Sequence, residues 1–132
     1  APQSDLDLAT VSEAIRISSG NSFVHETEGQ VILNGSRDIN FTMDLVLKDI
    51  GLFQSMADQA EVPLEISPQL IKIFEDSQAR FGQREWSPNI IRRLEEACET
   101  QVLAAGFPAQ ITDDEPEERG YEVVPPGRGN SD

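Results

Sequence analysis

Residues 40–62 read NFTMDLVLKDIGLFQSMADQAEV, and their apolar side chains recur at the spacing of an amphipathic helix. The apolar positions are Leu45, Val46, Ile50, Leu52, Phe53, Met56, Ala57 and Ala60. They form two adjoining rows, a stripe wide enough to be covered on more than one side. Asn40 is a suitable N-cap, and Pro63 ends the segment. The pattern predicts a long central helix over residues 40–62, roughly 30 Å in length at about 1.5 Å per residue.

Charged residues interrupt this apolar run at Lys48 and Asp49, and Gly51 follows at a helix-interior position. Lys48 comes nearly two helical turns after Phe41, so a helix that includes both would place them on one face. Asp49 would point about 80° away from that row, given roughly 100° per residue. In the simplest interpretation, Asp44 and Lys48 form a solvated i, i+4 ion pair worth a few tenths of a kcal/mol.

The rest of the chain predicts further helices around this central one, which makes an all-α bundle of about five helices. The expected ranges are 7–20, with Gly20 at its end, 21–34, 67–82, and 87–98 with a continuation to Gly106. Their starts are marked by Asp7, by Asn21 or Ser22, by Ser67-Pro68 and by Ser87-Pro88. Trp86 is placed to pack ahead of the last helix as a hydrophobic staple. The loops are short, as in antiparallel helix pairs.

The composition changes after residue 112. Residues 113–132 are acidic and rich in proline, with little to bury, and this is typical of an extended tail. Tyr121, Val123 and Val124 are the side chains through which an ordered tail would dock. We therefore predict a helical domain over 1–112 and a tail over 113–132.

The charge and cysteine content narrow the possible functions. A formal net charge of −14 over 132 residues disfavours nucleic acid and anionic membrane surfaces as partners. No apolar run approaches the roughly 18 residues of a membrane span, and no signal peptide is apparent. Cys98 is expected to be a buried reduced thiol, consistent with a cytoplasmic protein. His25 has no carboxylate or cysteine cluster around it in sequence, so neither a metal site nor a catalytic base is predicted.

Four pieces of the sequence, in order, resemble the C-terminal domain of the β-hydroxyacid dehydrogenases, a family that includes 3-hydroxyisobutyrate dehydrogenase, tartronate semialdehyde reductase and L-threonate dehydrogenase. The pieces are 6–8 with 17–20, 41–52 with Lys48-Asp49-Ile50-Gly51-Leu52 at its centre, 62–64, and 85–87 with 90–91. Together they cover roughly residues 5–98.

The resemblance implies a helical domain that closes over an active site and forms a dimer contact. In the family, an N-terminal Rossmann domain binds NAD or NADP, and a connecting helix carries the catalytic lysine. By the same resemblance, Lys48 would contact the nicotinamide end of the cofactor, and Phe41 and Asp49 would shape the substrate pocket. This chain shows no Gly-rich turn after a strand, so we expect no catalytic residue, no bound cofactor and no turnover from it alone.

Two functional hypotheses follow. In the first, the chain is the helical domain of an NAD(P)-dependent dehydrogenase for a short β-hydroxy acid, with its own Rossmann domain and a homodimer or higher homo-oligomer as partners. The alternative is a non-catalytic helical module for dimerisation or protein interaction, suggested by the wide apolar face of the central helix. Substitution of Lys48 in the complete enzyme separates the two.

Overall fold

The computed structural model describes residues 5–114, 116–117 and 119–120, and within them it confirms an all-α fold. The helices are α1 (Leu8–Arg16), α2 (Phe23–Asn34), α3 (Met43–Gln59), α4 (Ser67–Phe81), the short 3₁₀ helix η1 (Ser87–Ile91) and α5 (Arg92–Cys98). No strand is formed by the described residues, which contribute one isolated bridge, between Thr42 and Trp86. The described part of the tail has no regular secondary structure.

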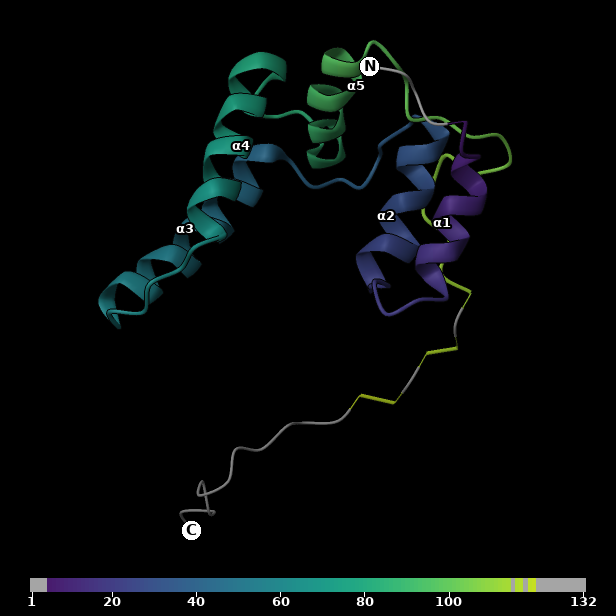
Figure 1. Ribbon diagram of the computed structural model, residues 1–132. Helices are drawn as coiled ribbons and strands as arrows, with labels where there is room; N and C mark the ends of the chain where they lie inside the picture. Colours follow the sequence, from purple (N-terminus) through teal and green to yellow (C-terminus); the bar gives the residue numbers. More distant parts are fainter. Residues whose placement is uncertain (1–4, 115, 118, 121–132) are drawn as a thin grey trace.

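The helices form two antiparallel pairs joined through the η1–α5 segment (Figure 1). α3 and α4 pack against each other as an arm, and α1 and α2 lie side by side at the other end. α5 lies between them, and a linker after α2 leads into α3. The buried apolar side chains are few: Val31 and Leu33 on α2, Met43 at the start of α3, and Pro88 in η1.

Two helices, α1 and α2, begin after N-cap residues that the sequence predicted. The Asp7 carboxylate accepts a hydrogen bond of 2.8 Å from the Thr10 N–H at the start of α1. Ser22 rather than Asn21 caps α2, accepting from the His25 N–H at 3.0 Å. Each side chain satisfies a first-turn donor that has no partner within the helix.

The predicted bounds of the central helix were wrong at both ends. α3 begins at Met43 after Thr42, and Asn40 has a left-handed φ of 53° instead of capping the helix. The reason is a long-range contact: the N–H groups of Met43 and Asp44 donate at 3.0 Å to carbonyls of residues 85 and 83. The loop before η1 therefore satisfies the donors that an Asn40 cap was expected to satisfy. The helix ends at Gln59, short of residue 62.

Three other predicted helix ends also needed correction. α1 ends at Arg16, before Gly20, because the Ser18 hydroxyl donates to the carbonyl of Ile15 at 2.9 Å. Ser67 lies inside α4 rather than capping it, and its buried hydroxyl has no hydrogen-bond partner. α5 stops at Cys98 because Glu99 adopts a left-handed conformation, so the continuation to Gly106 does not form.

The environment of Cys98 differs from expectation, and Trp86 makes a contact that was not predicted. Cys98 is exposed, because it is the last residue of the shortened α5 and the described residues that follow it form no helix. Trp86 is half-buried and pairs its backbone with Thr42 across the bridge, a contact that its position before η1 did not predict.

α3 is covered on one side only by the described chain. α4 packs along it, but Leu52, Phe53 and Met56 remain 59%, 58% and 69% exposed. The expected second covering of the central helix is therefore not supplied by these residues. Within the described part of the chain, none of the helices combines the length and apolar character that crossing a bilayer requires.

Candidate functional site: the α3 face around Lys48

The start of α3 is fixed by backbone contacts with the loop before η1. Besides the donors of Met43 and Asp44, the carbonyl of Phe41 accepts from the Ser87 N–H at 2.8 Å. Thr42 is 3% exposed and Met43 fully buried, so this junction excludes water. The first turn of α3 is consequently a rigid base for the side chains that follow it.

Asp44 belongs to this junction and is not available to Lys48. Its carboxylate accepts a short hydrogen bond from the Thr42 hydroxyl and a 3.2 Å bond from the Arg84 guanidinium. The Thr42 hydroxyl, and secondarily Arg84, lower the pKa of Asp44 below its usual value. The expected Asp44–Lys48 ion pair is therefore wrong, because both carboxylate oxygens of Asp44 already face other donors.

Lys48 instead pairs with the residue that follows it. Its Nζ lies 2.8 Å from an Asp49 carboxylate oxygen, and the two side chains are 59% and 54% exposed. An ion pair this exposed contributes little to stability, so both groups can exchange partners at low cost. The amine faces solvent in this chain rather than a closed interior.

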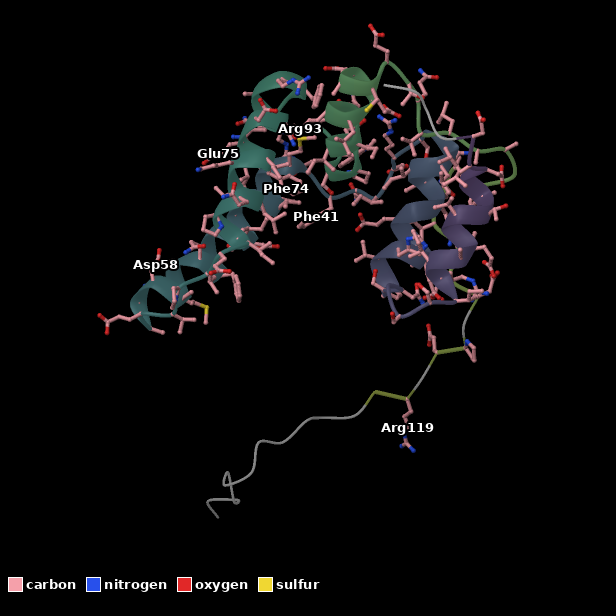
Figure 2. All side chains as sticks on the ribbon, viewed as in Figure 1. Phe41, Asp58, Phe74, Glu75, Arg93 and Arg119 are labelled. Atoms are coloured by element: carbon pink, nitrogen blue, oxygen red, sulfur yellow. The ribbon has the colours of Figure 1, made fainter. Side chains whose placement is uncertain are left out.

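Phe41 lies before α3 and is half-buried, at the base of the α3–α4 arm (Figure 2). The prediction that Phe41 and Lys48 share one helical face is wrong, because Phe41 lies outside α3. The structure brings Lys48 and Asp49 together and shows Phe41 in the linker. The functional roles of all three residues stay predictions.

A buried ion pair near α5 was missed by the sequence analysis. Arg37 donates to both carboxylate oxygens of Glu95, at 2.7 and 2.8 Å, and to the Asn89 side chain at 3.2 Å. The side chains of Arg37 and Glu95 are 11% and 10% exposed. They are 58 residues apart, so no local spacing could have indicated the pair.

Glu95 also accepts a hydrogen bond of 2.8 Å from the Val102 N–H. Burial raises the pKa of Glu95, but this N–H and the Arg37 guanidinium outweigh it, and the pKa lies below its usual value. The pair holds the linker after α2 against η1 and α5, and we assign it a structural role.

Three clefts of the described chain lie away from Lys48. One of about 460 Å³ adjoins the Arg37–Glu95 pair, and one of about 360 Å³ lies along α2 near Phe23. A cleft of about 350 Å³ lies at the tip of the α3–α4 arm, lined by Phe53 and residues 63–67. Across the described ranges, no group of three or more histidine, cysteine or acidic side chains could hold a metal ion.

Comparison with known proteins agrees with the residue pattern. Residues 1–94 match the family described as the NAD-binding domain of NADP-dependent 3-hydroxyisobutyrate dehydrogenase. The chain belongs to the β-hydroxyacid dehydrogenase family. It is also 33% identical over 94 residues to 2-(hydroxymethyl)glutarate dehydrogenase of Eubacterium barkeri. That alignment covers 70% of this chain but only 31% of the relative, so the chain spans about a third of the length of the curated protein it matches.

Family membership implies a nicotinamide dinucleotide, and the described residues fit one side of such a site, not a whole one. Lys48 offers an exposed ammonium on a rigid helix, which suits a polar group brought to it from outside. The described residues do not form a strand followed by a glycine-rich turn, the feature that would hold the pyrophosphate. The clefts given above do not include Lys48 in their lining. A dehydrogenase domain of this family would need a second unit to enclose the cofactor.

Proposed function

We propose that this chain is the helical domain of an NAD(P)-dependent dehydrogenase acting on a short β-hydroxy acid, and that it works together with a Rossmann domain. Lys48 contacts the nicotinamide end of the cofactor, while Phe41 and Asp49 shape the substrate pocket. The family match supports the reaction class. Without the Rossmann domain and its connecting lysine-bearing helix, the chain is inactive and binds no cofactor.

The observation that carries the proposal is the exposed Lys48–Asp49 pair on a helix whose first turn is pinned to the rest of the fold. A side chain that must meet a second domain needs an open side and a rigid support, and Lys48 has both. Asp49 lies 2.8 Å from the Lys48 amine, and this exposed pair can open at low cost when the second domain closes over it. When bound, the nicotinamide would supply the hydride transfer.

The exposed apolar surface of α3 supports a second part of the proposal, the formation of a homodimer or higher homo-oligomer. Leu52, Phe53 and Met56 are each more than half exposed along the helix that also carries Lys48. Adjacent apolar side chains of this size are commonly covered by another chain or domain. One face of α3 would then complete the pocket and the neighbouring surface would contact the partner protomer.

The composition of the chain supports the remaining parts of the proposal. Its formal net charge of −14 disfavours nucleic acid and anionic membranes as partners. A cytoplasmic location is consistent with the single, unpaired cysteine.

The decisive experiment compares Lys48→Ala with Lys72→Ala in the enzyme that carries both domains. These are the only lysines in the chain, and Lys72 is an exposed residue of α4. Loss of a charged hydrogen bond costs about 1.5–3 kcal/mol, so Lys48→Ala should weaken NADH or NADPH binding roughly tenfold or more. Lys72→Ala should leave affinity and turnover unchanged.

Cofactor affinity and turnover in Lys48→Ala that equal those of Lys72→Ala would refute the role of Lys48. The same enzyme, assayed with a series of short β-hydroxy acids, tests the substrate class. Turnover by the isolated chain with any of them would show that the Rossmann domain is not required.

A further inference from the structure

Residues 100–112, here called the strap, follow α5 and lie beyond residue 94, where the family match ends. The strap has no helix or strand of its own, yet it runs back across α2 (green to yellow in Figure 1). Its contacts therefore involve residues outside the matched part of the chain.

Side chains of α2 and of the linker after it hold the strap by its backbone. Asn34 donates to the carbonyl of Phe107 at 2.7 Å, and Ser36 donates to that of Ala109 at 2.6 Å. Gln30 donates to the carbonyl of Thr112 at 3.1 Å and accepts from the Thr112 hydroxyl at 3.0 Å. Gln30 and Asn34 are one turn apart and share a face of α2.

The strap is also anchored at its beginning. The Ala104 N–H donates to the carbonyl of Leu33 at 2.9 Å, using an acceptor left free at the end of α2. Leu103 packs so closely over Gly35 that a Cβ there would lie 2.8 Å from it. Together with the Val102–Glu95 bond, these contacts carry the chain from α5 onto α2.

One aromatic side chain sets the register. Phe107 is half-buried and lines a cleft of about 190 Å³ between α1 and α2, with Ala9, Ser12 and His25 among the other lining residues. The remaining contacts of residues 104–112 with α2 mostly involve backbone atoms, which every residue possesses. An extended segment held by its backbone and one aromatic pocket is a typical mode of peptide recognition.

We propose that the α1–α2 face is a binding site for an extended peptide with an aromatic anchor, and that the strap is its occupant from within the same chain. Phe107 lines the cleft between α1 and α2, so the occupant contacts both helices of this pair. Residues 105–112 of the strap dock and leave as a unit, because exposed hydrogen bonds and the Phe107 side chain hold them, whereas the beginning of the strap stays fixed to α2 and Glu95. A second copy of the same segment, supplied from outside, competes for the site.

The test uses the full chain in three forms: wild type, Phe107→Ala, and Gln110→Ala as the control. Gln110 is an exposed strap residue that makes no hydrogen bond in the structure. In Phe107→Ala, amide hydrogen exchange in α1 and α2 should accelerate at least tenfold, while exchange in α3 and α4 stays unchanged. Gln110→Ala should match wild type throughout.

A fluorescently labelled peptide of residues 100–114 then probes the freed site. It should bind Phe107→Ala at least tenfold more tightly than wild type, where the chain's own strap competes at high effective concentration. The same peptide carrying Phe107→Ala should not bind. Equal binding to both chains, or no binding to the variant at millimolar peptide, overturns the proposal. Phe107→Leu, which keeps an apolar anchor, replaces Phe107→Ala if that chain loses helical circular dichroism, and it should give an intermediate result.

Discussion

Replacing Glu95 by alanine removes the acceptor at the centre of the buried ion pair. Three hydrogen bonds are lost at once, two of 2.7 and 2.8 Å from Arg37 and one of 2.8 Å from the Val102 N–H. The Arg37 guanidinium then stays nearly buried without its carboxylate partner. Its remaining hydrogen bond is the one that it donates to the Asn89 side chain at 3.2 Å. The cost therefore comes mainly from an uncompensated charge rather than from lost packing.

The magnitude follows from that charge. Removing one partner of a buried ion pair typically costs about 3–5 kcal/mol. Here a cleft of about 460 Å³ adjoins both residues, so water can reach the stranded guanidinium and reduce the cost. We expect Glu95→Ala to lower the free energy of unfolding by about 2–4 kcal/mol, a large part of the 5–15 kcal/mol of an ordinary domain.

Urea unfolding followed by the fluorescence of Trp86, the only tryptophan, measures this loss. The matched control is Glu96→Ala, which removes the neighbouring carboxylate, 49% exposed and paired with Arg80 at the surface. That change should cost less than about 1 kcal/mol. Arg37→Met combined with Glu95→Leu, which removes both charges, should recover at least half of the loss. Equal stability of Glu95→Ala and Glu96→Ala would refute the assignment of a buried charge to this site.

The pH dependence has a definite sign. The pKa of Glu95 is lower in the folded chain than its usual value, so the unfolded state binds the proton more readily. The stabilisation that ionised Glu95 gives to the folded chain is therefore complete at pH values above the ordinary glutamate pKa. This stabilisation is lost as the pH falls through the lower pKa that Glu95 has in the folded chain. The difference in stability between wild type and Glu95→Gln should accordingly shrink as the pH is taken below about 4.

Three further predictions concern α1, α2 and α3. Asp7→Ala should lower the urea midpoint of unfolding through loss of the α1 cap, whereas Asp5→Ala should leave the midpoint unchanged. Burial raises the pKa of Glu28, so its ionised form opposes folding, and Glu28→Gln should stabilise the chain by a few tenths of a kcal/mol at pH 7 but not at pH 3. Phe53→Glu should abolish self-association in sedimentation while changing monomer stability by less than about 0.5 kcal/mol, with Gln59→Glu as the inert control.

The parts of the fold that sequence predicted are those determined by neighbours along the chain. Asp7 and Ser22 cap their helices because the donors they satisfy lie only three residues away. Gly35 ends α2 with a φ of 92°, a conformation that glycine adopts without strain. Helical periodicity likewise located all the longer helices, since it reports which face of each helix is apolar.

The errors arose where a distant segment took over a local role. Asn40 could cap a helix, but carbonyls of residues 83 and 85 reach the first turn of α3 instead, and this shift removed Phe41 from the helix. Asp44 faces Thr42 and Arg84, so it cannot pair with Lys48. The contacts with residues 83–85 have no signature in local spacing, because these residues follow α4 and reach the start of α3 only through the fold.

The apolar pattern of α3 predicts more coverage of this helix than the described chain provides. Its two rows predicted a helix covered on more than one side, yet α4 covers one side and Leu52, Phe53 and Met56 stay open. Because these side chains are already partly covered, leaving them as they are forgoes about 1–2 kcal/mol for each, compared with full burial. These apolar side chains lie on the same helix as the exposed Lys48–Asp49 pair. Under the proposed function, the Rossmann domain would meet the charged part of that surface, and the partner protomer would bury the apolar part.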